Sequence, residues 1–205
     1  MKLYCSPGTL SLAPQIAFHE AGIAVEAIGV DLARRRTDDG RDFDALSPLG
    51  QVPLLELDDG ATLHHAPVIL RFVAGLAPWA GLAAPDDGAL CDSLPALRLS
   101  EWLHCAEGSD GAVSLRQLGW IDLQLATGPY LCGSGLTIAD IYIWVLLAKG
   151  HSPDGGAIPC LAGEATGFGN IGRWHMRIAA RPAVRLACAD ERRLHTESRE
   201  LPVAR

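Results

Sequence analysis

The sequence predicts a mixed α/β domain at the N-terminus followed by an all-helical domain. Two observations support this fold class. Short apolar runs bounded by turn residues, which are typical of strands, occur only in the first third of the 205 residues. After a stretch rich in proline, glycine and alanine, apolar residues recur at three-and-four spacing, which is typical of amphipathic helices. We therefore expect an α/β domain over 1–78, a linker over 79–88 and a helical domain over 89–205.

The chain is predicted to begin with a strand, a helix and a second strand. Residues 2–5 (KLYC) have the composition of a short strand. Residues 10–22 (LSLAPQIAFHEAG) have helical spacing and end at a glycine, the residue that commonly closes a helix. Residues 25–32 (VEAIGVDL) alternate, which puts Ile28 and Val30 on one face of a strand. The first helix therefore connects two strands.

A hairpin and a further helix complete the first domain. Residues 33–50 are polar and rich in turn formers, which predicts a surface loop with a short irregular helix. Residues 52–57 (VPLLEL) and 61–65 (ATLHH) are the two arms of a hairpin around the tight-turn sequence DDG. Helical spacing resumes at Pro67, a residue suited to a first turn. The resulting order, β-α-β-α-β-β-α, is thioredoxin-like.

Four stretches of the second half are predicted to be helices. The stretch over 137–150 begins with Thr137 and Asp140 in a capping-box relation and then becomes almost wholly apolar, as in a buried central helix. The stretch over 114–128 carries Leu115, Leu118 and Ile121 at helical spacing. The four stretches are 93–108, 114–128, 137–150 and 169–184.

Composition excludes several classes of partner. The net charge is −7 and the chain holds only two lysines, so no broad basic field would attract nucleic acid or a membrane surface. No apolar run approaches the length that crosses a bilayer, and the N-terminus lacks a secretion signal, which favours a cytoplasmic protein. The six cysteines show no zinc-like or disulfide spacing, so we expect no metal site.

Adjacent histidines at the end of the predicted hairpin, His64 and His65, invite a metal or acid–base interpretation. Consecutive residues of a strand point to opposite faces of the sheet, so the two cannot hold one metal ion together. Only one of them can face a functional cleft, and the residue spacing does not decide which.

Segments spread over nearly the whole chain resemble the glutathione transferase family, particularly its bacterial beta class. GQVP before a strand and TIAD at the start of a late helix form a specific pairing. The resemblance implies a thioredoxin-like domain with a glutathione site, a helical domain, and a cytoplasmic homodimer that acts on small electrophilic molecules. The matching segments are KLY, SPG and LSLA near the start, VDL with Arg34–Arg36, SPLGQVPLLELDDG at 47–60, EW at 101–102, LTIAD at 136–140 and ARPAV at 180–184.

The resemblance also implies where glutathione would bind. In the family, the residue before a cis proline exchanges backbone hydrogen bonds with the cysteinyl unit of the tripeptide, and Val52 and Pro53 match this pair. An extended edge of this kind binds a peptide-like ligand as an added strand. Gln51 belongs to the same matching segment. Arg35 stands in the family's basic position, where it would meet the glycine carboxylate.

The start of the first helix departs from the beta-class pattern. The family cysteine, whose thiolate is favoured by the helix N-terminus, is replaced by Leu10. Ser11 follows, and related classes use a serine near this position to donate a hydrogen bond to the glutathione thiolate. Ser11 is therefore the first catalytic candidate and Thr9 the second. The alternative is that Ser11 only caps the helix. Cys5 is expected to be a packed thiol at the end of a strand.

The turn into the last helix of this domain is the second departure. The family places an acidic residue and a serine there to hold the γ-glutamyl end of glutathione, and this chain has His65 and Ala66. A hydrogen bond to a charged group contributes roughly 1.5–3 kcal/mol. Loss of the acid therefore predicts glutathione binding weakened by about one to two orders of magnitude. Pro67 also removes a backbone donor close to this helix end.

The helical domain is expected to have shortened helices. Between EW and TIAD the chain is roughly twenty residues shorter than the family pattern. In the family this interval lines the electrophile pocket and much of the dimer interface, so both are expected to be reduced.

Three functions remain open at this point. The first is a glutathione transferase-like enzyme with a degraded glutathione site and with Ser11 or Thr9 orienting the thiolate. The second is an enzyme of the same fold that works without glutathione, as an isomerase, cyclase or dehydratase of a small metabolite, with His65 or His64 as the acid–base group. The third is a non-catalytic binding protein.

Overall fold

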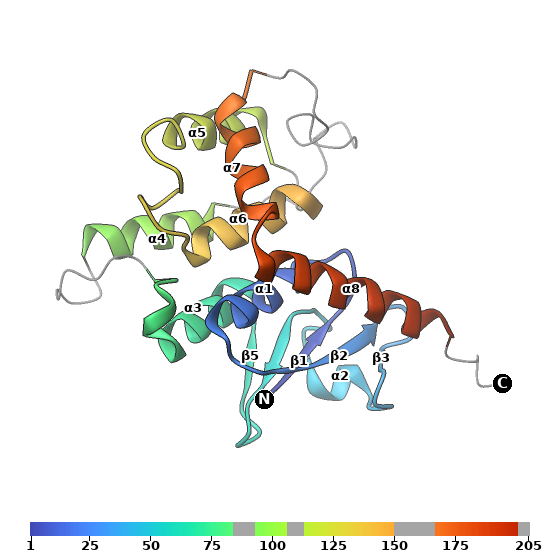
Figure 1. Cartoon of the computed structure of the whole chain (residues 1–205). Helices are drawn as coiled ribbons and strands as arrows, with labels where there is room; N and C mark the ends of the chain where they lie inside the picture. Colours follow the sequence, from blue (N-terminus) through green and yellow to red (C-terminus); the bar gives the residue numbers. More distant parts are fainter. Residues whose placement is uncertain (84–92, 106–112, 150–166, 201–205) are drawn as a thin grey trace. The chain divides into compact units, whose positions relative to one another are not determined.

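The computed structural model describes residues 1–83, 93–105, 113–149 and 167–200, and for residues 195–200 it describes the backbone only. The chain forms two compact units (Figure 1). The first contains Met1–Val73 and the chain from Pro182 onward, and the second contains Ala74–Arg181. Within the described segments, no helix is long and apolar enough to span a membrane.

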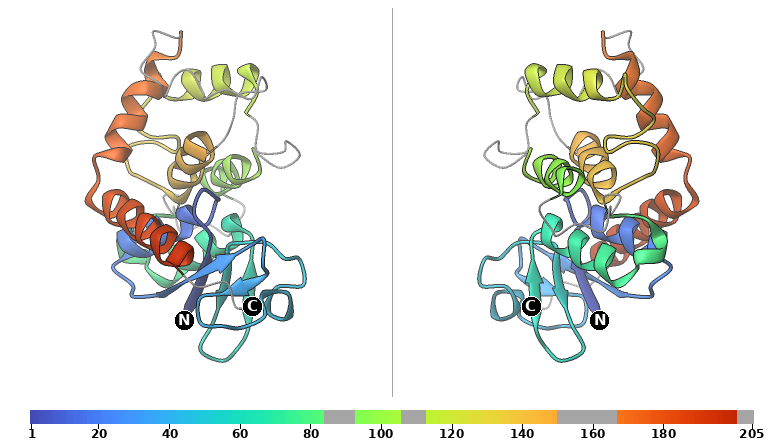
Figure 2. Two further views of the ribbon diagram at one scale, coloured as in Figure 1. Left: turned by 90° about the vertical axis from the view of Figure 1, so that its right-hand side faces the viewer. Right: turned by 90° about the vertical axis from the view of Figure 1, so that its left-hand side faces the viewer.

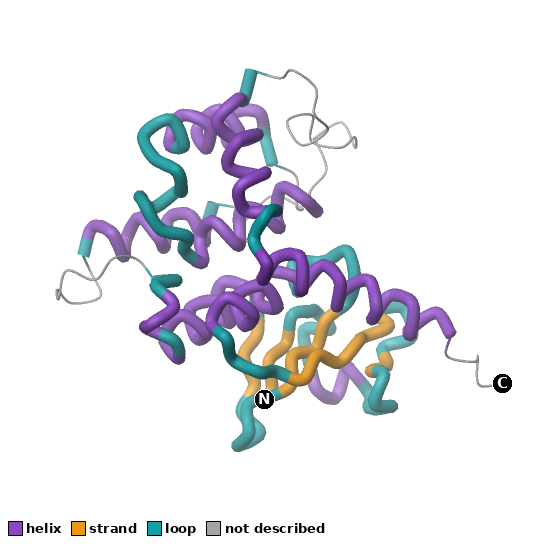
Figure 3. Tube along the Cα trace, viewed as in Figure 1, coloured by secondary structure: helices purple, strands orange, loops and turns teal. Residues whose placement is uncertain are grey.

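A five-stranded sheet is the centre of the first unit, and Figure 3 shows that the strands gather there. β1 runs parallel to β2 and antiparallel to β4, and the two edge strands pair antiparallel with their neighbours. The strand order is β3-β2-β1-β4-β5, and the strands are β1 (Lys2–Cys5), β2 (Glu26–Asp31), β3 (Arg36–Thr37), β4 (Leu54–Glu56) and β5 (Thr62–His64).

The predicted order of elements is confirmed, with one addition. β3 was not expected, because two residues cannot show an alternating pattern; the strand forms where Arg36 and Thr37 turn back to pair with Asp31 and Val30. The predicted hairpin is present, with Leu54 opposite His64. The expected short helix in the loop is α2 (Phe43–Leu46), which places Phe43 in a cluster of buried side chains that also contains Tyr4, Ile28, Val30 and Leu54.

Three longer helices belong to the first unit wholly or in part: α1 (Leu12–Ala21), α3 (Ala66–Leu76) and α8 (Pro182–Glu200). Gly22 ends α1 in a left-handed conformation with φ 66°. α8 packs along α1 and β2 (Figure 2), whereas the predicted division placed all of 89–205 in the helical domain and predicted no separate helix after residue 184. Its buried side chains explain the placement; they are Ala183, Val184, Ala187 and Leu194. Residues 84–88 of the expected linker lie outside the described residues.

The second unit is helical. Asp140 caps its central helix by accepting hydrogen bonds from the backbone and hydroxyl of Thr137, as the capping-box spacing predicts. The predicted stripe on the second helix holds for Leu118 and Ile121, but Leu115 lies at the exposed start of the helix. The helices are α4 (Leu94–His104), α5 (Leu115–Gln124), α6 (Ile138–Lys149) and α7 (Gly169–Ala179), preceded by a short 3-10 helix, η1 (Pro78–Ala80).

Candidate functional site

The strand register brings the predicted site residues to one edge of the sheet. β1 ends at Cys5 and leads into the loop before α1, while antiparallel β4 begins at Leu54, opposite Tyr4. β5 ends at His64, which is paired with Leu54. The start of α1, the chain before β4 and the start of α3 therefore lie at the same edge. Parallel β2 also ends there, so the turn that contains Arg35 is at this edge as well.

The two candidate hydroxyls bond to each other and to the loop before α1. Ser11 is fully buried; its Oγ accepts from the Ser6 N–H at 3.2 Å and lies 3.1 Å from the Ser6 carbonyl oxygen. Thr9 Oγ1 donates to the same carbonyl at 2.7 Å and lies 2.8 Å from Ser11 Oγ. The hydroxyl protons are thus used within the loop. Ser11 makes no side-chain cap on α1, so its capping interpretation is wrong; it fastens the loop instead.

Thr9 and Leu10 are more accessible than Ser11, since both are half-buried. Leu10 occupies the expected position beside the N-terminus of α1, where its carbonyl accepts from the Ala13 N–H. The partial positive charge at a helix N-terminus favours an anion such as a thiolate. At this position a negative charge would therefore be stabilised by the N-terminus of α1, and no cysteine is present there.

Cys5 is a packed thiol, as predicted. It is buried, its Sγ donates to the Leu3 carbonyl at 3.2 Å, and burial raises its pKa to about 12. A thiol with that pKa is protonated at neutral pH and does not serve as a nucleophile. Within the described part of the chain, no group of three or more histidine, cysteine or acidic side chains is arranged to hold a metal ion.

The chain before β4 has the expected backbone form. The Val52–Pro53 peptide bond is cis. Among the described residues, neither the N–H nor the carbonyl of Val52 has a hydrogen-bond partner. Gln51 is exposed next to it, and its backbone is fastened to the Ser47 hydroxyl. Val52 therefore presents one free donor and one free acceptor at the site edge.

Arg35 reaches the same segment from the turn between β2 and β3. Its backbone is left-handed, with φ 55°, and its Nη1 donates to the Gly50 carbonyl at 2.7 Å. The same nitrogen lies 3.7 Å from a carboxylate oxygen of Asp44. Because the side chain is nearly half exposed, this ion pair contributes little to stability. The remaining guanidinium donors are available at the rim of the site.

The histidine pair separates at the start of α3. His65 is exposed with a left-handed backbone, φ 66°, and its carbonyl accepts from the Ile69 N–H, so it stands at the helix N-terminus. His64 is half-buried on β5, and its Nδ1 is buried without a hydrogen-bond partner among the described residues. Ala66 is buried and offers no hydroxyl. Of the two histidines, His65 is the one exposed at the site edge.

Glu191 is a residue of this site that the sequence did not single out. Its Oε1 accepts from the Gly8 N–H at 3.1 Å, which ties α8 to the loop that carries Thr9. No signal in the sequence could have found it, because the contact joins residues 183 positions apart and depends on α8 packing against α1.

The fold and this site edge define a protein of the glutathione transferase type, and comparisons with known proteins agree. The family models described as glutathione S-transferase, N-terminal domain, and glutathione S-transferase, C-terminal domain, match residues 10–76 and 113–182. Glutathione S-transferase GstA from Escherichia coli O157:H7 is 29% identical over 211 residues, which cover 93% of this chain and 98% of the relative.

Solved structures give the same answer. A sphingomonad glutathione S-transferase complexed with glutathione is 36% identical, with a TM-score of 0.75, and the match covers 93% of this chain and 98% of that one. A bacterial beta-class glutathione S-transferase from Sphingomonas chungbukensis is 35% identical, with the same TM-score and coverage. The chain belongs to the glutathione S-transferase family.

Proposed function

We propose that this protein binds glutathione at the described edge of the sheet and joins its sulfur to small electrophilic molecules. The observation that carries the proposal is the register of β1, β4 and β5, which brings the N-terminus of α1, the unpaired backbone of Val52 and the start of α3 to one place. A sphingomonad relative of 36% identity is described as complexed with glutathione, which supports the same ligand here.

The N-terminus of α1 would stabilise the thiolate, and the Thr9 hydroxyl would add a hydrogen bond by turning away from the Ser6 carbonyl. The helix end supplies positive potential, and Thr9 is the less buried of the two hydroxyls. The thiolate sulfur would attack the electrophilic carbon, form a carbon–sulfur bond and expel a leaving group with its electron pair. Ser11 would act through the loop, because its hydroxyl is fully buried and bonded to Ser6.

The γ-glutamyl end of glutathione would be held weakly. His65 and Ala66 supply neither a carboxylate nor a hydroxyl, so the ligand ammonium would lack a charged partner there. The missing interaction is worth roughly 1.5–3 kcal/mol, which corresponds to about a 10- to 150-fold loss in affinity.

Calorimetric titration with glutathione tests this proposal, with His65→Glu as the informative variant. The introduced carboxylate would restore an acidic partner at the start of α3 and should tighten binding at least about tenfold. His104→Glu, the same chemical change at an exposed residue of α4, should leave the affinity unchanged. Absence of binding to the unmodified protein at millimolar glutathione, together with no gain in the His65→Glu variant, would refute the proposal.

A second candidate function is supported by the exposure of His65. At a helix N-terminus beside an open edge, its imidazole is placed to transfer a proton to or from a small substrate without any need for glutathione. A screen of small carbonyl and halogenated substrates, run with and without glutathione, separates the two functions. Turnover that is independent of glutathione and abolished by His65→Ala would favour this second function.

We also propose that the protein is a homodimer, as the resemblance implies. Exposed Leu94 and Leu97 on α4 support the proposal, because large apolar side chains grouped on one helix commonly mark an interface. Light scattering coupled to gel filtration measures the mass directly. A mass of 21.7 kDa at all concentrations would identify a monomer and reject the proposal.

A further inference from the structure

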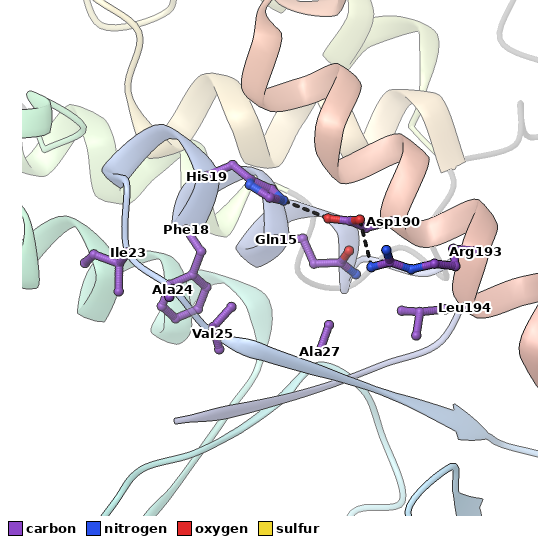
Figure 4. A pocket seen from close by; sticks show the side chains of 10 residues that line it. All are labelled: Gln15, Phe18, His19, Ile23, Ala24, Val25, Ala27, Asp190, Arg193 and Leu194. Carbon is purple, nitrogen blue, oxygen red and sulfur yellow. Dashed lines mark hydrogen bonds and ion pairs between the residues drawn. The ribbon is translucent and has the colours of Figure 1, made fainter.

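A cavity of about 290 Å³ lies between α1, β2 and α8 in the first unit (Figure 4). It is close to the residues that follow α1, at the opposite end of that helix from Thr9 and Leu10. It is therefore a different place from the glutathione edge. The volume is near the lower limit of small-molecule sites. Its polar lining residues are Gln15, His19, Asp190 and Arg193, and Ala24 is one of the apolar ones.

Gln15 points from α1 into this cavity (Figure 4). Its side chain is 4% exposed, and neither its amide nitrogen nor its amide oxygen has a hydrogen-bond partner among the described residues. The amide lies beside the Cys5 thiol and lowers the pKa of that thiol against the larger effect of burial, but the Cys5 Sγ donates its proton to the Leu3 carbonyl. The primary amide therefore has an unpartnered donor and an unpartnered acceptor, both buried at the wall of the cavity.

Such an amide is unusual, because a buried polar atom without a partner costs about 1–3 kcal/mol. An apolar residue at this position would avoid the cost of leaving both polar atoms of the amide unpaired. The arrangement is explained if a bound molecule supplies one acceptor and one donor side by side. That pattern is the edge of a carboxamide, a lactam or a related planar heterocycle.

The charged residues at the cavity compensate one another. Asp190 accepts from Arg193 at 3.0 Å and lies 3.0 Å from the Nε2 of His19, and Figure 4 shows the three side chains in one row. An anion would have to share Arg193 with the Asp190 carboxylate. A neutral ligand meets no such competition.

The rest of the lining is apolar. Phe18, Ile23 and Val25 lie on one side of the cavity, and Leu194 lies on the α8 side. Ala27 of β2 is small and leaves room below Gln15. A planar apolar body would fill this space and gain about 25 cal/mol for each Å² of apolar surface removed from water.

We propose that this cavity is a second ligand site, which binds a small neutral molecule that combines a planar apolar body with an amide-type edge paired to Gln15. Three probes of similar size separate the contributions. Benzamide offers a donor and an acceptor, acetophenone an acceptor only, and benzoate a charged acceptor.

The experiment is a titration of the ¹⁵N-labelled full chain with each probe, followed by NMR. Benzamide should shift the side-chain amide signals of Gln15 and the backbone signals of Ala24 and Val25. It should bind about five- to tenfold more tightly than acetophenone, the gain expected from one additional hydrogen bond. Glutathione added at millimolar concentration should leave the benzamide shifts in place.

The informative variant is Gln15→Met, which keeps the side-chain length and removes both polar atoms. It should abolish the preference for benzamide over acetophenone, while a melting temperature equal to or above that of the unmodified protein shows that the fold is intact. Gln124→Met on α5 is the matched control and should change neither. Gln124 lines a cavity between α4 and α5 that also contains Trp102 and Trp120, so it reports on the alternative location.

Four results would overturn the proposal. They are equal binding of benzamide and acetophenone, tighter binding of benzoate, shifts that map to α4 and α5 and disappear in the Gln124 variant, and no shift from any probe at millimolar concentration.

Discussion

Replacement of Asp140 is expected to destabilise the helical unit strongly. The carboxylate is fully buried at the start of α6. One oxygen accepts from the Leu131 N–H and the Trp174 Nε1–H, each at 2.9 Å. The other accepts from the N–H and the hydroxyl of Thr137, at 3.0 and 2.9 Å. A single side chain therefore satisfies three N–H groups drawn from three different segments.

The loss in free energy of unfolding follows from the number of donors that are left without an acceptor. Asp140→Ala leaves three N–H groups unpaired, at about 1–3 kcal/mol each. Because neighbouring losses are not additive, we expect a total of roughly 3–5 kcal/mol. Asp140→Asn keeps one acceptor oxygen for the Leu131 and Trp174 donors. Its side-chain nitrogen, which is itself a donor, would then face the Thr137 N–H and could not accept from it. Its expected loss is about 1–3 kcal/mol, the value for one unpaired group.

Urea unfolding followed by tryptophan fluorescence measures both losses. Asp122→Asn is the matched control, since Asp122 also caps a helix by accepting from the backbone of Asn170 and Ile171, but it is only half-buried. Its loss should be about 1 kcal/mol. The reasoning would be refuted if Asp140→Ala lost less than about 1.5 kcal/mol, or if the asparagine variant lost as much as the alanine variant.

Three further predictions concern the first unit. Hydrogen bonds from Tyr4 and Arg41 hold the pKa of Glu56 in the folded protein below its usual range. The ionised carboxylate therefore stabilises the fold at pH values above the pKa of the unfolded chain. This stabilisation is lost as the pH falls through the lower pKa of the folded protein. Urea midpoints between about pH 3 and 6 should show that decline, and Glu56→Gln should reduce it. Ser11→Ala removes the hydroxyl that fastens the loop before α1 and should cost about 1–3 kcal/mol in thermal unfolding, whereas a neutral outcome would mean that Thr9 alone holds the loop. Gly22→Ala forces an L-residue into the left-handed conformation that ends α1 and should lower the free energy of unfolding by about 1–2 kcal/mol. A smaller loss would mean that the end of the helix relaxes, which amide exchange at Ile23 would detect.

Local patterns predicted most elements of the fold because their causes are local. The alternation around Ile28, the glycine that ends α1 and the turn of the hairpin each depend on residues close in sequence. The capping relation of Thr137 and Asp140 is likewise contained within four residues. The two-residue β3 was missed because pairing with β2, and not its own sequence, makes it a strand.

The candidate site was predicted in part. Resemblance supplied Val52, Pro53, Arg35 and the start of α3, and the register places all of them at one edge of the sheet. The role of Ser11 could not be foreseen, because its burial and its bonds to Ser6 arise from the way the loop closes over α1. The Glu191–Gly8 contact and the unpaired Gln15 depend on where α8 packs, which no local pattern encodes.

The sequence by itself predicted the family and most of the succession of elements, since both rest on local spacing and local identity. Only the tertiary structure decided that α8 joins the thioredoxin-like unit and that His65, and not His64, is exposed at the site edge. The physical reason is that burial and hydrogen-bond satisfaction are properties of residues brought together from distant parts of the chain.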